Sequence, residues 1–252
     1  PVKNQWENVT RMTTGKAEFE ATVIGKKIYV AGGWSGNKYL NLLEVYDCEK
    51  NTWTELAPME NALSDIGMTT LNKQIYVAGG WDGAGSISSV MKYSPHSNIW
   101  SKVKPMNEKR HCHELITLQG TIYAIGGRDT KTVERYNSLF NKWTFVAPTK
   151  HIHDYPGVAS HQNKIYVLGD QGFEVFDPAS DTWQELPSLN IGKGSRLVSM
   201  NDKLLAVGVG VGGNKDKASK TVYEFDTVNN SWIHLPDMDV ARKHHRAVVV
   251  NF

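Results

Sequence analysis

A tryptophan recurs along this chain at intervals of 40 to 49 residues, and this spacing constrains the fold more than any other feature. The series occupies positions 6, 53, 100, 143, 183 and 232. An aromatic residue stands seven positions before each of the last five: Tyr46, Tyr93, Tyr136, Phe176 and Phe225. A period of this length is typical of proteins built from one small supersecondary unit that must stack on its neighbours to bury a core.

Each unit also contains a β-branched, aromatic-rich stretch that ends in glycine. The stretches at 27–31, 74–78 and 121–125 are followed by the pairs Gly32-Gly33, Gly79-Gly80 and Gly126-Gly127. We assign the fourth pair to Gly169-Asp170 and the fifth to Gly212-Gly213, within a Gly/Val-rich insertion at 207–213. Glycine in these places predicts positive φ or a close backbone approach at the end of a strand.

The pattern predicts four short strands in each unit, named a to d in chain order. In the first unit they are expected at 20–24, 28–31, 43–46 and 53–56, bounded by turn-forming residues. The c–d hairpin turn should lie at Asn51, Asn98, Asn141, Asp181 and Asn230, because Asn and Asp tolerate the left-handed conformation. No window has a sustained helical period. A single four-stranded sheet cannot bury both of its faces, so the sheets should stack radially.

The Gly-Gly and Tyr-x6-Trp pattern resembles the kelch repeat over essentially the whole chain. The segment Trp53-Thr54-Glu55-Leu56-Ala57-Pro58-Met59 is most similar to the kelch half of the BTB–kelch adaptors. The resemblance implies an all-β kelch β-propeller, here a single domain over 1–252. We expect five complete four-stranded repeats, at 18–62, 63–108, 109–150, 151–191 and 192–241.

The two ends of the chain predict the strands of a sixth blade. Asn4 and Trp6 match the turn and strand-d positions of a unit, so 1–17 is expected to carry an outer strand. The segment 242–252 has the pattern of an inner strand a. We hypothesise that the sequence belongs to a longer protein whose propeller has six blades, the alternative being a five-bladed ring with frayed ends.

Composition narrows the classes of function. The chain has 252 residues, 40% of them hydrophobic, with 28 Lys plus Arg against 26 Asp plus Glu. These values exclude disorder and a globally basic nucleic-acid binder, and no apolar stretch approaches the ~20 residues of a membrane span. The chain opens without a signal-peptide pattern and has two cysteines, so we expect a cytoplasmic protein.

No catalytic, metal-binding or cofactor site is expected. His111-Cys112-His113 invites a metal hypothesis, but the other histidines belong to different units and zinc needs three or four converging ligands. Cys48 and Cys112 should open on opposite faces of a propeller, so a disulfide between them is not expected. Some kelch propellers are enzymes, but their ligand constellations are not evident in this sequence.

The loops that join b to c, and d to the next a, are the candidate partner-binding site, because both open on one face of a propeller. The candidate residues are Trp34, Ser35, Asn37, Tyr39, Asp65, Trp81, Asp82, Arg110, His111, Arg128, Asp129, His153, Tyr155, Arg196 and His244. Two alternatives stay open: Trp34 and Trp81 either wedge between blades or line the mouth of the ring. The basic d–a residues are either solvated surface or a site for an acidic or phosphorylated peptide.

The resemblance implies a protein-interaction module that recognises the substrate of a cullin-RING ubiquitin ligase. A cullin would be contacted only through BTB and BACK regions that this sequence does not contain. The alternatives are an actin-binding cytoskeletal scaffold and, less favoured, a propeller enzyme. Neither nucleic acid nor membrane is an expected partner.

Overall fold

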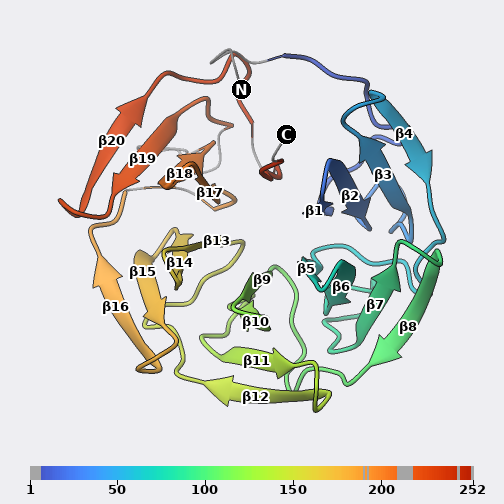
Figure 1. The fold of residues 1–252 in the computed structure, drawn as a ribbon, viewed down its shortest axis with the longest axis horizontal. Coiled ribbons are helices and arrows are strands. Elements are labelled where there is room, and N and C mark those ends of the chain that lie inside the picture. The colour runs from blue at the N-terminus through green and yellow to red at the C-terminus, as the bar shows by residue number, and fades with distance from the viewer. Residues whose placement is uncertain (1–6, 190, 192, 209–217, 243–244, 251–252) are drawn as a thin grey trace.

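The computed structural model describes residues 7–189, 191, 193–208, 218–242 and 245–250. This part of the chain forms twenty strands and no helix, so it contains no helix long and apolar enough to cross a membrane. The strands make five antiparallel four-stranded sheets arranged as the blades of a ring (Figure 1).

Each blade consists of four strands that are consecutive in the sequence. Blade 1 contains β1 (Glu20–Ile24), β2 (Lys27–Ala31), β3 (Leu43–Asp47) and β4 (Thr52–Glu55). Blade 2 contains β5 (Gly67–Leu71), β6 (Gln74–Ala78), β7 (Val90–Ser94) and β8 (Ile99–Val103). Blade 3 contains β9 (Glu114–Leu118), β10 (Thr121–Ile125), β11 (Val133–Asn137) and β12 (Lys142–Val146). Blade 4 contains β13 (Gly157–His161), β14 (Lys164–Gly169), β15 (Gly172–Asp177) and β16 (Thr182–Leu186). Blade 5 contains β17 (Arg196–Met200), β18 (Lys203–Val207), β19 (Val222–Asp226) and β20 (Ser231–Leu235).

The inner strands β1, β5, β9, β13 and β17 lie next to one another in this order around the axis. The predicted all-β propeller with five four-stranded blades is therefore confirmed. Between blades 5 and 1 the N-terminal segment runs along the outside of the ring and the C-terminal segment lies inside it (Figure 1). Residues 245–250 form no strand, and 1–6, 243–244 and 251–252 lie outside the described residues, so the split sixth blade stays a prediction.

The repeated residues connect each blade to the one before it. In blade 2, Tyr93 is paired with Trp100 across β7 and β8, and the two ring centroids lie 5.1 Å apart. The indole Nε1 of Trp100 donates to the Ala57 carbonyl, 2.8 Å away in the linker that follows blade 1. Asn98 has a φ of 56°, and its Oδ1 accepts from the Tyr93 hydroxyl at 2.7 Å and the Ala57 amide at 2.9 Å. The aromatic residue, the asparagine and the tryptophan of this repeat therefore connect the blade to the linker of the preceding blade by hydrogen bonds.

The indole hydrogen bond recurs in every blade, whereas the hydroxyl bond to the turn asparagine is made by the tyrosines of blades 1 to 3 and cannot be made by Phe176 and Phe225. The other indoles donate to Thr10, Lys104, Ala147 and Pro187, at 2.8 to 2.9 Å. All five predicted turn residues, Asn51, Asn98, Asn141, Asp181 and Asn230, have positive φ as expected. Thr10 occupies the linker position that Ala57 holds in the next blade, so the N-terminal segment docks on blade 1 in the same manner.

The glycine pairs behave as predicted in the first three blades. Gly79 has a φ of 61°, and a Cβ there would lie 2.5 Å from the Arg110 carbonyl oxygen of blade 3. The assignment of the fifth pair to Gly212-Gly213 was wrong. Strand β18 ends at Val207 and is followed by Gly208, which has a φ of 68° and takes the place of the first glycine. The glycines of the inserted loop led to an assignment too far along the chain. Gly212-Gly213 lie outside the described residues.

The hydrophobic core lies between the blades and not within them. One cluster, for example, packs Leu43 and Val45 of blade 1 against Met68 and Ile75 of blade 2. Because each face of a sheet is covered by the next blade, the loop ends are held on a rigid ring.

Candidate functional site

The linkers that precede the inner strands form a collar around one mouth of the ring. Glu18, Asp65, Cys112 and Tyr155 each have a φ between 52° and 57°, just before blades 1 to 4. Each collar residue's amide donates to the carbonyl of the one before it: Asp65 to Glu18, Cys112 to Asp65 and Tyr155 to Cys112, all at 3.0 Å. This chain of hydrogen bonds ties the d–a linkers of four blades together.

Two aromatic loops stand beside the collar. Trp34 stacks on Tyr39 at 4.7 Å within the first b–c loop, and a Cβ at Gly83 of the second loop would lie 3.0 Å from the Tyr39 ring. Trp81 packs on His111 at 5.1 Å, and His111 Nδ1 pairs with the Ser86 hydroxyl at 2.8 Å. Both tryptophans are half-buried. The backbone of each tryptophan pairs with the linker before its own blade, at Ala17 and Ser64, while the Trp81 ring also reaches His111 in the linker before blade 3.

The charged groups at the collar are mixed in sign. The pKa of His111 is lowered by burial and by the neighbouring Arg128, while Asp65, Asp154 and Asp129 oppose the shift. Lys193 forms an ion pair with Asp154 at 2.6 Å, and this contact raises the pKa of the Lys193 ammonium. Burial raises the pKa of the Cys112 thiol and of the Tyr155 phenol, and Asp65 adds to both effects. Residues from blades 2 to 5 therefore converge electrostatically at this mouth.

Arg110 and His153 do not belong to the surface of this mouth, which corrects the sequence prediction. Arg110 is 1% exposed and His153 is completely buried. The Arg110 guanidinium contacts the buried Glu134 carboxylate of β11 at 3.2 Å and the Thr132 carbonyl at 2.8 Å. His153 Nε2 likewise contacts Glu174 of β15 at 2.9 Å. The Arg110 guanidinium and the His153 ring thus each contact a buried carboxylate of their own blade.

The residue pair that corresponds to Arg110 and Glu134 differs from blade to blade. In blade 1, Lys16 pairs with the buried Glu44. In blade 2 the equivalent residues are Leu63 and Met91, both buried in the apolar core between blades. The ion pair can therefore be replaced by an apolar pair without a change of fold.

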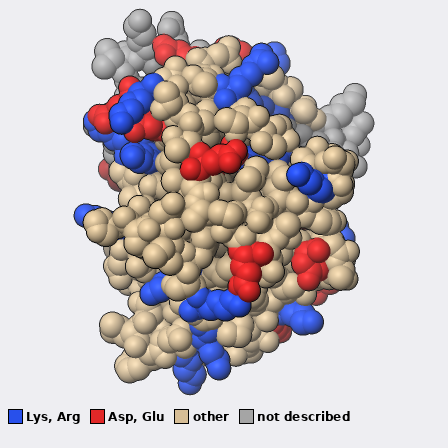
Figure 2. All heavy atoms as spheres, turned by 90° about the vertical axis from the view of Figure 1, so that its right-hand side faces the viewer, with Lys and Arg blue, Asp and Glu red and all other residues tan. Residues whose placement is uncertain are grey.

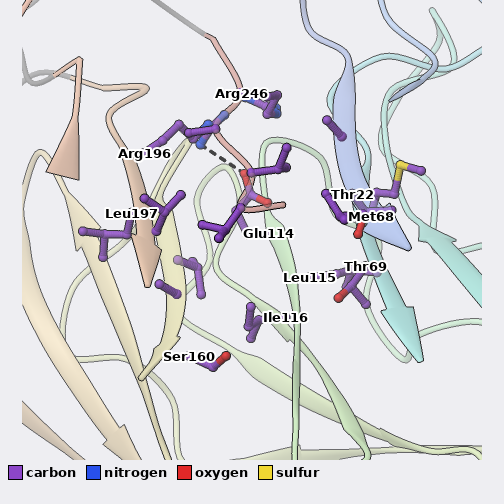
Figure 3. A pocket seen from close by; sticks show the side chains of 18 of the residues that line it. Thr22, Met68, Thr69, Glu114, Leu115, Ile116, Ser160, Arg196, Leu197 and Arg246 are labelled. Carbon is purple, nitrogen blue, oxygen red and sulfur yellow. Dashed lines mark ion pairs between the residues drawn. The ribbon is translucent and has the colours of Figure 1, made fainter. Parts of the chain in front are cut away.

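Arg196 lies inside the central channel and not on a loop surface, which is a second correction. It is 4% exposed, and its Nη1 lies 3.0 Å from Glu114 Oε1 of β9 (Figure 3). Arg246 pairs with Glu20 of β1 at 2.6 Å. These four residues surround one end of a cavity of about 310 Å³ between the inner strands. Burial raises the pKa of Glu114, and repulsion from Glu20 adds to the effect.

Sequence reasoning missed this buried network, although a signal was present. The inner strands begin in turn with Glu20, Gly67, Glu114, Gly157 and Arg196. Arg246 holds the corresponding position in the C-terminal segment. Two acids and two arginines at one repeat position indicate mutual pairing. Arg196 Nε also donates to the His245 carbonyl at 3.0 Å, so the network holds the C-terminal segment in the channel.

The remaining predicted residues stay at or near the surface. Asn37, Asp82, Arg128 and Asp129 are exposed, whereas Asp65 and His111 are buried just beneath them. Ser35 donates to Asn37 Oδ1 at 2.8 Å. His244 lies outside the described residues. We use the name loop face for Trp34, Ser35, Asn37, Tyr39, Trp81, Asp82, Arg128, Asp129 and Tyr155.

The described side chains include no group of three or more His, Cys, Asp or Glu that could share a metal ion. Cys48 is half-buried and Cys112 is buried, and neither forms a disulfide. The side of the ring in Figure 2 bears acidic and basic side chains scattered among uncharged ones.

Comparison with known proteins places the chain in the kelch-repeat family. The family described as the KLHDC2/KLHL20/DRC7 Kelch-repeats domain matches residues 2–127, half of the chain, and the Kelch motif matches 109–150. The chain therefore belongs to the kelch-repeat proteins, as the repeat pattern predicted.

Two curated relatives carry the same repeats. Kelch repeat and BTB domain-containing protein 8 of Danio rerio is 31% identical over 108 residues, which cover 43% of this chain and 18% of that protein. Kelch-like protein terF of Aspergillus terreus is 30% identical over 134 residues, or 46% of this chain and 29% of that protein. The chain thus matches less than a third of the length of these relatives.

Among solved structures, YjhT superposes with a TM-score of 0.82, covering 95% of this chain and 89% of that one. The two sequences are 14% identical, so this likeness concerns the fold alone.

Proposed function

We propose that the chain is a protein-recognition module that binds a peptide or loop of another protein at the loop face. The observation that supports this most directly is the presentation of half-buried aromatic rings, Trp34, Tyr39 and Trp81, beside exposed polar groups on a hydrogen-bonded collar. Aromatic anchors on a rigid surface with a polar rim are the usual basis of strong protein contacts. This role requires neither a cofactor nor a catalytic group.

The charge of the site argues for a partner that carries both signs. Two of the arginines that favoured an acidic or phosphorylated peptide, Arg110 and Arg196, are buried against Glu134 and Glu114. Among the described candidates, Arg128 is left as the exposed basic group, with the exposed Asp82 and Asp129 in the adjoining loops. A peptide bearing an acidic group for Arg128 and a hydrogen-bond donor for the two aspartates fits this arrangement.

Within the cell, we propose that the chain acts in the cytoplasm and selects substrates for a cullin-RING ubiquitin ligase. The support for this role is sequence similarity, because a relative at 31% identity is named for kelch repeats and a BTB domain. The cullin contact would not involve the residues described in this structure.

A capture experiment tests recognition at the loop face. Proteins retained from a cell lysate by the wild-type chain are compared with those retained by Trp81→Ala/Arg128→Ala. The matched control is Glu49→Ala/Lys50→Ala in the blade 1 c–d turn, which lies at the opposite end of its sheet. We expect a defined set of proteins to be lost only with the loop-face variant. Retention of the same set by all three proteins would contradict the proposal.

The ligase step has its own test. Proteins that depend on the loop face should accumulate in cells in which the gene for this chain is deleted. If their half-lives are unchanged, the ligase role is wrong and the recognition role stands alone.

A further inference from the structure

The outer hairpins of the five blades differ in charge. These hairpins consist of strands c and d with their turn. Those of blades 1, 4 and 5 carry accessible carboxylates at Asp47, Glu49, Glu55, Asp177, Asp181, Glu185, Glu224 and Asp226. The β7–β8 hairpin contains no Asp or Glu, and the β11–β12 hairpin contains only Glu134, which is fully buried against Arg110. The outer hairpins of blades 2 and 3 therefore carry no accessible acid of their own.

The same hairpins expose large apolar side chains. Leu139 is 89% exposed and Phe140 is 78% exposed, both in the β11–β12 turn. Ile99 of β8 and Phe145 of β12 are more than half exposed as well. At the positions of Leu139 and Phe140, blade 1 has Glu49-Lys50, blade 2 His96-Ser97 and blade 4 Ala179-Ser180. An apolar pair at this turn is a property of blade 3 and not of the repeat.

Hydrogen bonds to Asn137 hold the backbone of the blade 3 turn. The amides of Leu139 and Phe140 donate to Asn137 Oδ1 at 3.0 and 3.2 Å, and Asn141 has a φ of 48°. Because these hydrogen bonds already fix the backbone of the turn, little backbone entropy is lost when a partner covers Leu139 and Phe140, which favours binding.

Basic side chains surround the apolar turn. Lys104 and Lys142 are exposed, and neither has a carboxylate within 4.0 Å among the described residues. Lys104 lies beside the turn because its amide donates to Asn141 Oδ1 at 2.9 Å. Lys102, by contrast, pairs with Glu60 at 2.8 Å. Blades 2 and 3 are neighbours in the ring (Figure 1), and the bond from the Lys104 amide to Asn141 joins the segment after β8 to the β11–β12 turn.

We propose that this surface, the basic-apolar rim, binds an acidic segment of a partner protein that carries large apolar side chains. The rim is defined by Ile99, Lys104, Leu139, Phe140 and Lys142. The two lysines complement carboxylates of the segment, and the Leu139–Phe140 pair and Ile99 bury its apolar residues. The c–d turns lie at the end of each sheet opposite the b–c loops, so the rim is a site separate from the loop face.

The probe is a fluorescently labelled amphipathic peptide of Glu and Leu, and binding is followed by anisotropy. One control peptide replaces Glu by Gln and the other replaces Leu by Ser. The protein variant is Leu139→Glu/Phe140→Lys, which transplants the blade 1 turn into blade 3. The matched control is Val228→Glu in the blade 5 turn, which is 87% exposed. Urea unfolding confirms that each variant is folded.

We expect the peptide to bind the wild-type chain and the Val228→Glu control equally. Binding should weaken about tenfold or more with Leu139→Glu/Phe140→Lys, since such a change removes the apolar anchors. Both control peptides should bind at least several-fold more weakly than the probe.

Three results would overturn the proposal. The first is absence of binding, or equal binding by the rim variant and the control. The second is binding to vesicles containing phosphatidylserine but not to the peptide, which would make the rim a membrane contact. The third is self-association in sedimentation velocity that the rim variant abolishes, which would make the occupant a second copy of the chain.

Discussion

His113 makes the stability of this propeller sensitive to acid. Its ring fills the space beside two glycines of blade 2: a Cβ at Gly67 would lie 2.7 Å from its Nε2, and one at Gly79 would lie 2.7 Å from its Cε1. His113 is 2% exposed, and neither ring nitrogen has a hydrogen-bond partner among the described residues. Burial, with smaller contributions from Arg110 and His111, lowers the pKa of His113 from 6.5 to about 3.

The sign of the effect follows from proton linkage. Below a pH of about 6.5 the unfolded chain takes up a proton at this histidine, whereas the folded chain does not until the pH approaches about 3. The folded state therefore loses stability as the pH falls between these values. At 1.36 kcal/mol per pH unit, the loss from this group is about 2 kcal/mol between neutral pH and pH 5.

Urea unfolding of the wild type and of His113→Leu, at pH 7.5 and pH 5, measures this contribution. Leucine suits the site because Phe19 and Ile66 hold the equivalent positions in blades 1 and 2. The decline in unfolding free energy should be about 2 kcal/mol smaller in the variant than in the wild type. His96→Leu, at an exposed turn, is the control and should decline as the wild type does. Equal declines in wild type and His113→Leu would refute the reasoning.

Three further predictions concern the connections between and within blades. Arg110→Leu should lower the free energy of unfolding by about 3–5 kcal/mol because it removes the cation paired with the buried Glu134 carboxylate. Arg110→Leu/Glu134→Met, which recreates the apolar pair of blade 2, should recover part of this loss, since methionine cannot accept the hydrogen bonds that Glu134 receives from Asn107 and Glu108. The thermodynamic cycle is measured by urea unfolding, and absence of recovery would contradict it. Asn98→Ala should cost about 1–2 kcal/mol more than Asn98→Gly, since both lose two hydrogen bonds but only alanine resists the positive φ; equal losses would dismiss the conformational argument. Gly79→Ala should cost about 2–4 kcal/mol, because its Cβ would lie 2.5 Å from the Arg110 carbonyl oxygen, and a thermal midpoint equal to that of the wild type would refute this.

Features that depend on local chemistry could be predicted from the sequence. The turn residue Asn98 and its partners Tyr93 and Trp100 lie within one hairpin, and the need for positive φ selects Asn, Asp or Gly wherever the hairpin recurs. The strands expected in the first unit agree with β1 to β4 to within one residue at each end. These predictions were dependable because similar hairpin contacts recur in each blade.

Features that depend on contacts between strands were harder to predict. Arg110 stands in a linker that looks solvated, and its partner Glu134 is 24 residues further along the chain. Arg196 likewise contacts Glu114, which belongs to a blade two places away. The recurrence of glutamate two residues before the strand-c aromatic, at Glu44, Glu134 and Glu174, was the available signal. A repeated charge at an internal position of a strand indicates a buried partner and not a binding surface.

The most direct test of recognition at the loop face is site-specific photo-crosslinking in cells. A photoreactive amino acid is placed at Asp82 or Arg128 on the loop face, and at Lys50 in the blade 1 turn as the control. We predict that the first two positions crosslink to the same partner protein and that position 50 does not. Crosslinks to that partner of equal yield from position 50, or none from either loop-face position, would contradict it.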